Sequence, residues 1–305
     1  MMKYYNDVRE MIGHTPLLKL NHMDFPDGLN VFAKLELFNP GGSVKDRMGS
    51  ALISDAEDRG ILKPGSTILE ATAGNAGIGI ALAALGKGYR VIFAVPEKFS
   101  EEKQTIMKAY GAEIVHTPLE KGMQGAIEKV KELKKQVEHP VTLSQFENPA
   151  NPLAHYRTTG PEIWDDLDGK VDALVAGAGS GGTLSGVAKY LREQNPSVKI
   201  VMADPIGSTM GGGEPGCYSI EGIGNTFMPR TMNMSLVNQV YKINDEEAVE
   251  ELRLLAAREG VLAGTSSGAA LAAVRKAAQK APKGSNIVVV LPDRGDRYFS
   301  KHIYE

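Results

Sequence analysis

The chain has 305 residues, of which 42% are hydrophobic and 23% are charged, and its formal net charge is -3. This is the composition of a folded globular protein, and at about 100–200 residues per domain the length predicts two domains. The weak negative charge and the lack of a Lys/Arg-rich block argue against a nucleic-acid-binding surface. The single cysteine, Cys217, excludes an intramolecular disulfide and favours a reducing compartment.

The N-terminus and the apolar runs bear on location. The first residues, Met-Met-Lys-Tyr-Tyr-Asn-Asp, lack the apolar stretch of a signal peptide, and no apolar run reaches membrane-spanning length. We therefore expect a cytoplasmic protein with neither a membrane nor a nucleic-acid partner. The six histidines do not show metal-ligand spacing, so we expect no metal site.

Extended and helical patterns alternate along the chain. Strands are predicted at residues 31–36, 66–70, 90–95, 113–115, 141–143, 173–175, 199–203, 238–243 and 287–291. Helices are predicted at residues 44–59, 75–85, 100–110, 125–137 and 183–194, and from residues 245 and 267 onward. This alternation predicts an α/β fold with mainly parallel sheets and helices on both faces.

Two irregular stretches divide this pattern. The Asn- and Pro-rich residues 148–152 predict a domain boundary. Residues 205–230 are rich in Gly and Pro without periodicity, which predicts a long loop of the kind that is usually functional or disordered. We predict two three-layer α/β domains: an N-terminal one of residues 43–147, and a larger C-terminal one of residues 1–42 and 148–305.

Lys45 is the first candidate for chemistry. The preceding Pro40 and the pair Gly41-Gly42 break regular structure, so Lys45 falls in the first turn of a helix, at the positive end of the helix dipole. A lysine whose charge is disfavoured gives up its proton readily, and a neutral amine can form a Schiff base with an aldehyde. By itself, the pattern also fits a solvated lysine in a first turn.

A glycine-rich turn, residues 177–183, follows the strand 173–175 and opens a helix. Such turns present backbone N–H groups to a phosphate. Read literally, Gly177, Gly179 and Gly182 satisfy the dinucleotide fingerprint G-x-G-x-x-G, with Asp204 near the position of a ribose-binding acid. The turn therefore predicts a phosphate site without specifying the ligand.

Two further small-residue turns precede helices. In the first, residues 72–77, exposed N–H groups would suit a carboxylate, and Asn75 adds a side-chain donor. The same turn also fits a purely structural, close-packed role. The second, residues 264–268, precedes an alanine-rich helix and is typical of an N-cap.

Taken together, a Schiff-base lysine, a phosphate cup, a carboxylate turn and a serine turn suit pyridoxal 5'-phosphate (PLP). In their order along the chain and in their residues, these motifs resemble the cysteine synthase/cystathionine β-synthase family of fold-type-II PLP enzymes. The resemblance runs from Gly13 to Asp293, and it is strongest to bacterial enzymes that make cystathionine from O-acetylserine and homocysteine. It implies a tryptophan synthase β-like fold with PLP in the cleft between the two domains, and a homodimer.

The resemblance also implies roles for individual residues. Lys45 is implied as the aldimine lysine and as the base at Cα, and Asn75 as the partner of the cofactor's phenolic oxygen. Ser266 is implied to face the pyridine nitrogen. The implied phosphate cup consists of Gly179, Ser180, Gly181, Gly182 and Thr183. The implied substrate-binding residues are Thr72, Ala73, Asn75, Ala76, Gln145 and Gly222.

The implied reaction is β-replacement on an amino-acid substrate, O-acetyl-L-serine or L-serine or L-cysteine, through an aminoacrylate. Homocysteine or sulfide is the nucleophile, giving cystathionine or L-cysteine. Ala73 and Ala76 depart from the family's usual Thr-Ser-Gly-Asn-Thr loop by two hydroxyls, and Glu221 matches the cystathionine synthase branch.

Four alternatives are open at this point. Two belong to the same fold: an L-cysteine β-lyase that produces hydrogen sulfide, and a serine/threonine dehydratase. A nicotinamide dehydrogenase would use the literal fingerprint but leaves Lys45 and Ser266 unexplained. An inactive relative that binds a partner protein is disfavoured by the presence of Lys45.

Overall fold

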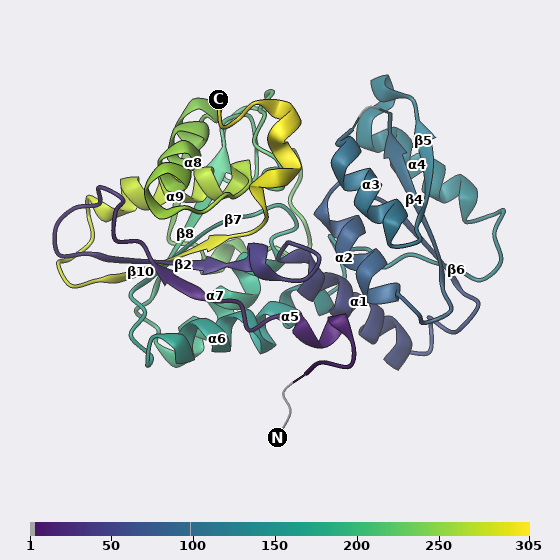
Figure 1. Cartoon of the computed structure of the whole chain (residues 1–305), viewed down its shortest axis with the longest axis horizontal. Helices are drawn as coiled ribbons and strands as arrows, with labels where there is room; N and C mark the ends of the chain where they lie inside the picture. Colours follow the sequence, from purple (N-terminus) through teal and green to yellow (C-terminus); the bar gives the residue numbers. More distant parts are fainter. Residues whose placement is uncertain (1–3, 98) are drawn as a thin grey trace. The chain divides into compact units, whose positions relative to one another are not determined.

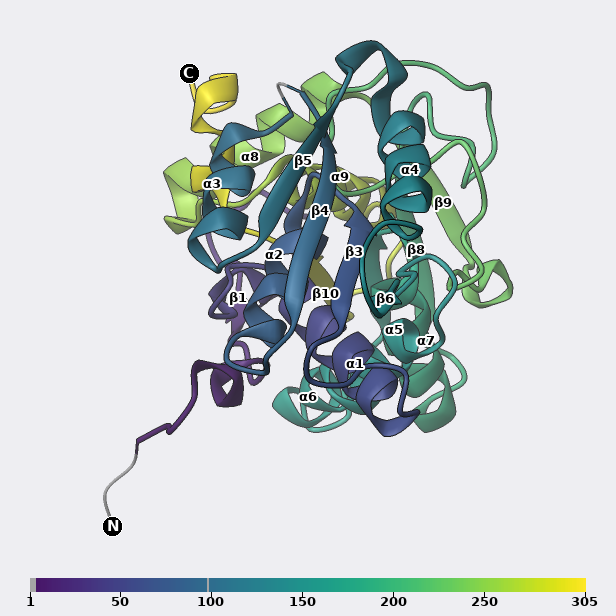
Figure 2. The same ribbon diagram turned by 90° about the vertical axis from the view of Figure 1, so that its right-hand side faces the viewer.

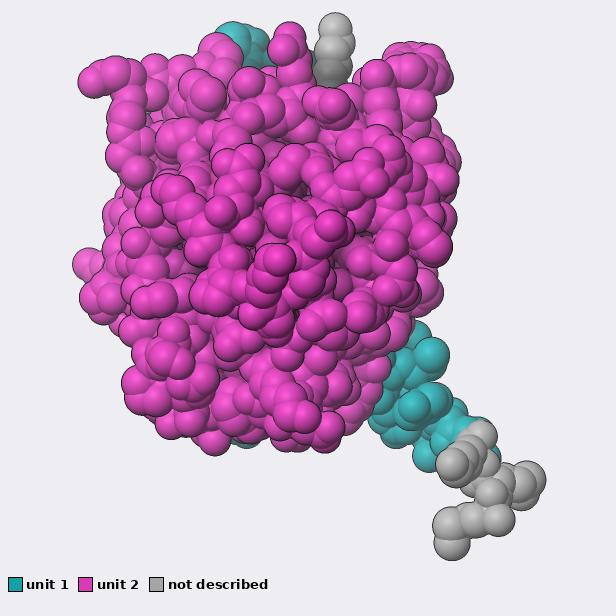
Figure 3. All heavy atoms as spheres, turned by 90° about the vertical axis from the view of Figure 1, so that its left-hand side faces the viewer, with its two compact units in different colours: residues 1–12, 45–150 teal, residues 13–44, 151–305 magenta. Residues whose placement is uncertain are grey.

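The structure is a computed structural model that describes residues 4–97 and 99–305 (Figure 1). It divides into two compact units, coloured separately in Figure 3. Unit 1 contains residues 4–12 and 45–150, and unit 2 contains residues 13–44 and 151–305. Each unit is an α/β sandwich with its own sheet, which confirms the predicted fold class.

In the part of unit 1 that the structure describes, four strands form one sheet, and all neighbouring strands run parallel (Figure 2). Their order across the sheet is β5 (Glu113–Thr117), β4 (Arg90–Pro96), β3 (Thr67–Ala71) and β6 (Pro140–Val141). Side chains alternate between the two faces of such strands. Ile68 and Phe93 therefore belong to one apolar cluster, and Leu69 and Ile92 to another.

Helices cover both faces of this sheet. The Ile68 cluster includes side chains from α1 (Lys45–Asp58), α2 (Asn75–Ala84) and α3 (Glu101–Ala109). The Leu69 cluster includes Ala126 and Val130 of α4 (Gly122–Leu133). Unit 1 therefore buries apolar residues on both sides of its sheet, as parallel sheets do.

Six strands form the sheet of unit 2, in the order β1 (Leu17–Lys19), β2 (Asn30–Leu35), β10 (Asn286–Leu291), β7 (Ala173–Gly177), β8 (Lys199–Pro205) and β9 (Gln239–Ile243). Only the pair β1–β2 is antiparallel within the described residues. One face packs on α8 (Asp245–Glu259) and α9 (Thr265–Ala278), and the other on α6 (Thr159–Asp166) and α7 (Gly182–Gln194). A further helix, α5 (Ala150–Arg157), precedes α6.

Short 3-10 helices complete the described structure, at Val8–Met11, Glu36–Phe38, Leu119–Lys121, Met234–Leu236 and Gly295–Lys301. In residues 4–97 and 99–305, no helix is long and apolar enough to cross a membrane.

Residues 4–12 group with unit 1, whereas the sequence analysis assigned them to the larger C-terminal domain. The physical reason is Arg9, whose guanidinium donates to the carbonyl oxygens of Ala83 (3.4 Å) and Leu85 (2.9 Å) at the end of α2. The sequence analysis also missed β1, α5 and α6, which are short.

Candidate active site

Lys45 is the first residue of α1, as predicted, and its side chain is partly buried. Helix α1 packs on α2 through backbone at two glycines. A Cβ atom on Gly79 would lie only 2.2 Å from the Lys45 carbonyl oxygen, and one on Gly49 only 2.3 Å from the Gly79 carbonyl carbon. The first turn of α1 is therefore fixed against α2, whose first residue is Asn75.

The candidate substrate turn connects β3 to α2. Thr72, Ala73 and Ala76 are buried, and Gly74, the N-cap of α2, makes no side-chain capping hydrogen bond. The first N–H groups of a helix have no acceptor within it, so the start of α2 offers donors to an anion. Gly77 fits closely here, since a Cβ on it would lie 2.4 Å from Met107 Sδ.

Glu70, a residue that the sequence analysis missed, organises the loop of Gln145. Its Oε1 atom accepts hydrogen bonds from the backbone N–H groups of Leu143 (2.5 Å) and Ser144 (2.8 Å). Ser144 has a left-handed backbone, with φ of 56°, which a side chain rarely adopts. Burial raises the pKa of the Glu70 carboxyl, and the two N–H donors oppose that shift. Glu70 thus ties β3, which leads into the substrate turn, to the loop before Gln145.

The candidate phosphate cup connects β7 to α7 in unit 2. Gly181 is the N-cap of α7 with φ of 80°, and it supplies no side-chain cap. The carbonyl oxygens of the cup have other partners: Asn225 Nδ2 donates to Gly179 O (2.7 Å) and Thr231 Oγ1 to Ser180 O (2.5 Å). With these acceptors occupied, the turn presents chiefly N–H groups, which suits a phosphate.

Gly222 and Ser266 lie beside this cup. A Cβ on Gly179 would approach the Gly222 carbonyl oxygen to 2.4 Å, and a Cβ on Gly222 would be 3.9 Å from Ser266 Oγ. The Glu221 N–H donates to Thr265 Oγ1 at 2.9 Å, and Thr265 is the first residue of α9. Unit 2 therefore brings together the cup, the Gly222 loop and the buried Ser266, three elements that are far apart in sequence.

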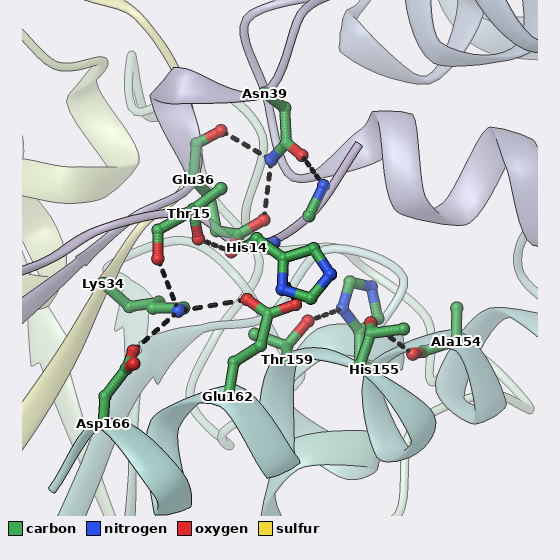
Figure 4. Close-up of polar contacts among 12 residues, drawn as sticks. His14, Thr15, Lys34, Glu36, Asn39, Ala154, His155, Thr159, Glu162 and Asp166 are labelled. Atoms are coloured by element: carbon green, nitrogen blue, oxygen red, sulfur yellow. Dashed lines mark hydrogen bonds and ion pairs between the residues drawn. The ribbon is translucent and has the colours of Figure 1, made fainter. Parts of the chain in front are cut away.

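A polar cluster surrounds the buried Lys34 of β2 (Figure 4). Lys34 Nζ donates to the Thr15 carbonyl oxygen at 2.6 Å and pairs with Glu162 Oε2 at 3.0 Å and Asp166 Oδ2 at 3.1 Å. The Lys34 side chain is only 1% exposed. Its charge is compensated by two carboxylates, as a buried charge requires.

The same cluster continues to Asn39. Glu36 accepts from Thr15 Oγ1 at 2.7 Å through Oε1 and from Asn39 Nδ2 at 2.8 Å through Oε2, and Asn39 Oδ1 accepts from the Gly13 N–H at 2.8 Å. Asn39, at the start of the segment before Lys45, is therefore held on both sides of its amide (Figure 4). The sequence analysis did not identify this support.

The structure gives Asp204 a structural partner. Its Oδ2 atom accepts from Lys242 Nζ at 2.6 Å and from the Gly211 N–H at 2.9 Å, and the residue is buried. Asp204, the acid that a dinucleotide site would use to bind a ribose, therefore forms hydrogen bonds with residues of unit 2. Among the residues that the structure describes, no group of three His, Cys, Asp or Glu side chains could hold a metal ion.

The comparison with known proteins identifies the class. A family model described as "Pyridoxal-phosphate dependent enzyme" matches residues 8–293. The chain belongs to this family and is a PLP-dependent enzyme. The cup fits the cofactor's phosphate, because the Gly179 and Ser180 carbonyls accept other hydrogen bonds and α7 begins without a side-chain cap.

Particular relatives narrow the class. The chain is 52% identical over 304 residues to the O-acetylserine dependent cystathionine beta-synthase of Bacillus subtilis, covering 100% of this chain and 99% of that protein. It is 46% identical over 305 residues to a cysteine synthase of Staphylococcus aureus, covering 99% and 98%. The solved O-acetylserine dependent cystathionine beta-synthase of Helicobacter pylori matches with TM-score 0.95, 44% identity and 100% coverage of both chains. The predicted family, fold type and cofactor are confirmed.

Proposed function

We propose that the protein catalyses β-replacement on O-acetyl-L-serine, with homocysteine as nucleophile and cystathionine and acetate as products. The observation that carries the proposal is the placement of Lys45, the first residue of α1, in backbone contact with the α2 helix that Asn75 begins. The full-length similarity to an O-acetylserine dependent enzyme supports the choice of donor.

In this proposal PLP, when bound, supplies an electron sink for the pair of electrons left at Cα. Lys45 would hold the cofactor, remove the Cα proton as acetate leaves Cβ, and return it after the thiol sulfur has bonded to Cβ. Asn75 would donate to the cofactor ring oxygen, and the cup, Gly179 to Thr183, to its phosphate. Ser266 would face the ring nitrogen as a neutral partner, which leaves the ring a moderate sink suited to β-elimination.

The substrate carboxylate would be bound mainly by the turn of residues 72–77. The start of α2 supplies backbone donors, and the Thr72 hydroxyl supplies another. The proposed substrate-binding residues are Thr72, Ala73, Asn75, Ala76, Gln145 and Gly222. We further propose that the protein works in the cytoplasm as a homodimer.

A second candidate is cysteine synthesis, in which sulfide replaces homocysteine. The similarity to a cysteine synthase over nearly the whole chain favours it. The two reactions share every step up to the departure of acetate, so only the nucleophile distinguishes them.

The test is an absorption titration of PLP-supplemented protein with O-acetyl-L-serine, followed by homocysteine or sulfide. We expect the protein to show a cofactor absorption band that changes when O-acetyl-L-serine is added and returns when homocysteine is added. Mass spectrometry should then detect cystathionine. A cofactor band unaffected by O-acetyl-L-serine would refute the assignment of this compound as the donor substrate. Cysteine formed without any cystathionine would assign the nucleophile as sulfide.

A lysine variant tests the assigned base. Lys45→Ala should lose turnover while keeping its fold, whereas Lys63→Ala, an exposed lysine of the same unit, should keep both. Steady-state activity retained in Lys45→Ala would refute the assignment.

A further inference from the structure

Helix α5 supplies two polar side chains to the back of the cup. Asn151 and His155 are one helical turn apart, so they lie on the same face of α5. Asn151 Nδ2 donates to Ser180 Oγ at 3.0 Å, and His155 Nε2 lies 3.2 Å from Thr183 Oγ1. Both contacted residues belong to the proposed cup, and both α5 side chains are buried, at 1% exposure each.

The His155 ring uses both of its nitrogens. Nδ1 lies 2.9 Å from Thr159 Oγ1 in α6 (Figure 4), and Nε2 contacts Thr183. A neutral imidazole donates through one nitrogen and accepts through the other, and each threonine hydroxyl has one proton. The three groups therefore form a chain whose hydrogen bonds can run in either of two directions.

The direction decides what Thr183 offers to a ligand. If Nδ1 carries the proton, Thr183 donates its own proton to Nε2 and presents only lone pairs, which repel a phosphate oxygen. If Nε2 carries the proton, Thr183 accepts from His155 and its hydroxyl proton is free to donate to the phosphate. A phosphate in the cup thus favours the second direction, since bonds to a charged acceptor are the stronger ones.

We propose that His155 is a positioning residue, which donates from Nε2 to Thr183 and thereby aims the Thr183 hydroxyl at the cofactor phosphate. Thr159 donates to Nδ1 and completes the relay from α6 through α5 to the start of α7. This inference rests on the proposed function, because it takes the cup as the phosphate site. It concerns a group that does not itself touch the cofactor.

The direct test is nitrogen-15 NMR of histidine-labelled holoenzyme, with the His155 signals assigned by their loss in His155→Gln. We expect Nε2 of His155 to carry hydrogen, both with PLP and in apoenzyme with inorganic phosphate. A hydrogen on Nδ1 together with an unprotonated Nε2 overturns the proposal. This measurement uses the wild-type protein, so it does not depend on the folding of a variant.

A double-mutant cycle tests whether His155 acts through Thr183. Loss of a hydrogen bond to a charged group should raise the PLP dissociation constant about 10-fold in Thr183→Val and in His155→Leu. The double variant should be no weaker than Thr183→Val alone. Multiplied effects, about 100-fold by the same estimate, would show that His155 acts independently and would refute the relay.

Two further variants complete the design. His155→Gln can place an amide N–H near the position of Nε2 and should recover most of the affinity lost in His155→Leu. The exposed His22→Leu is the matched control and should bind PLP as the wild type does. A wild-type protein that takes up no PLP would refute the proposed function, whereas a PLP-loaded wild type with the wrong ring proton refutes the relay alone.

Discussion

The contact between α1 and α2 allows a sharp test of Lys45. In Gly79→Ala the new Cβ would lie 2.2 Å from the Lys45 carbonyl oxygen, 2.6 Å from its carbonyl carbon and 3.0 Å from the Asp46 nitrogen. All three are backbone atoms, so no side chain can rotate away. Relief to an ordinary contact requires α1 and α2 to separate by about 1 Å at Lys45, and overpacking of this kind costs about 1–3 kcal/mol of stability.

Such a displacement should affect catalysis as well as stability. A reacting group misplaced by about 1 Å can lose about 100-fold in rate. We expect Gly79→Ala to unfold at lower urea concentration and to lose about 100-fold in kcat, whereas the exposed Gly216→Ala, with its nearest atom at 3.4 Å, changes neither. A variant that loses stability but keeps wild-type kcat would show that the position of Lys45 does not matter, and would refute its role.

Two further predictions concern the cup and Glu70. In Gly182→Ala the Cβ would lie 1.9 Å from Asn151 Oδ1, so equilibrium dialysis should show at least about 10-fold weaker PLP binding; unchanged affinity would place the phosphate elsewhere. The raised pKa of buried Glu70 means that the folded protein keeps this proton to higher pH than the unfolded chain does, so its contribution to stability falls as pH rises above the ordinary value of 4.5. Urea titrations at a series of pH values above 4.5 should show that the stability of the wild type declines with pH, whereas that of Glu70→Gln changes less. An identical dependence of stability on pH in the two proteins would contradict this prediction.

Local signals made much of the fold predictable. The buried strands β4 and β10 and the glycine turn before α7 each lie within one short stretch of sequence, so periodicity and turn residues were enough. Helix α5 was missed because its eight residues, Ala-Asn-Pro-Leu-Ala-His-Tyr-Arg, place polar side chains on the cup and therefore lack an apolar stripe. Pro161 and Gly160 weakened the helical signal of α6 in the same way.

The supporting residues of the site could not be predicted because their contacts are distant in sequence. Glu70 and Ser144 are 74 positions apart, and Gly179 and Asn225 are 46 apart. Nothing local distinguishes Glu70 from a surface glutamate or Asn225 from an ordinary loop residue. The residues proposed to touch the cofactor came from motifs, whereas those that orient the motifs required the folded chain.

The long loop of residues 205–230 shows why the residues that support the site matter. A backbone turn offers carbonyl acceptors as well as N–H donors, so its preference for an anion is strengthened when the carbonyls are occupied. Asn225 occupies the carbonyl of Gly179, and its own N–H and C=O are bonded to the Ser208 hydroxyl. Asn225→Ala should therefore leave the cup's N–H groups in place but free an acceptor beside the phosphate, weakening PLP about 3- to 10-fold. Wild-type affinity in that variant would mean that the cup selects phosphate without its loop.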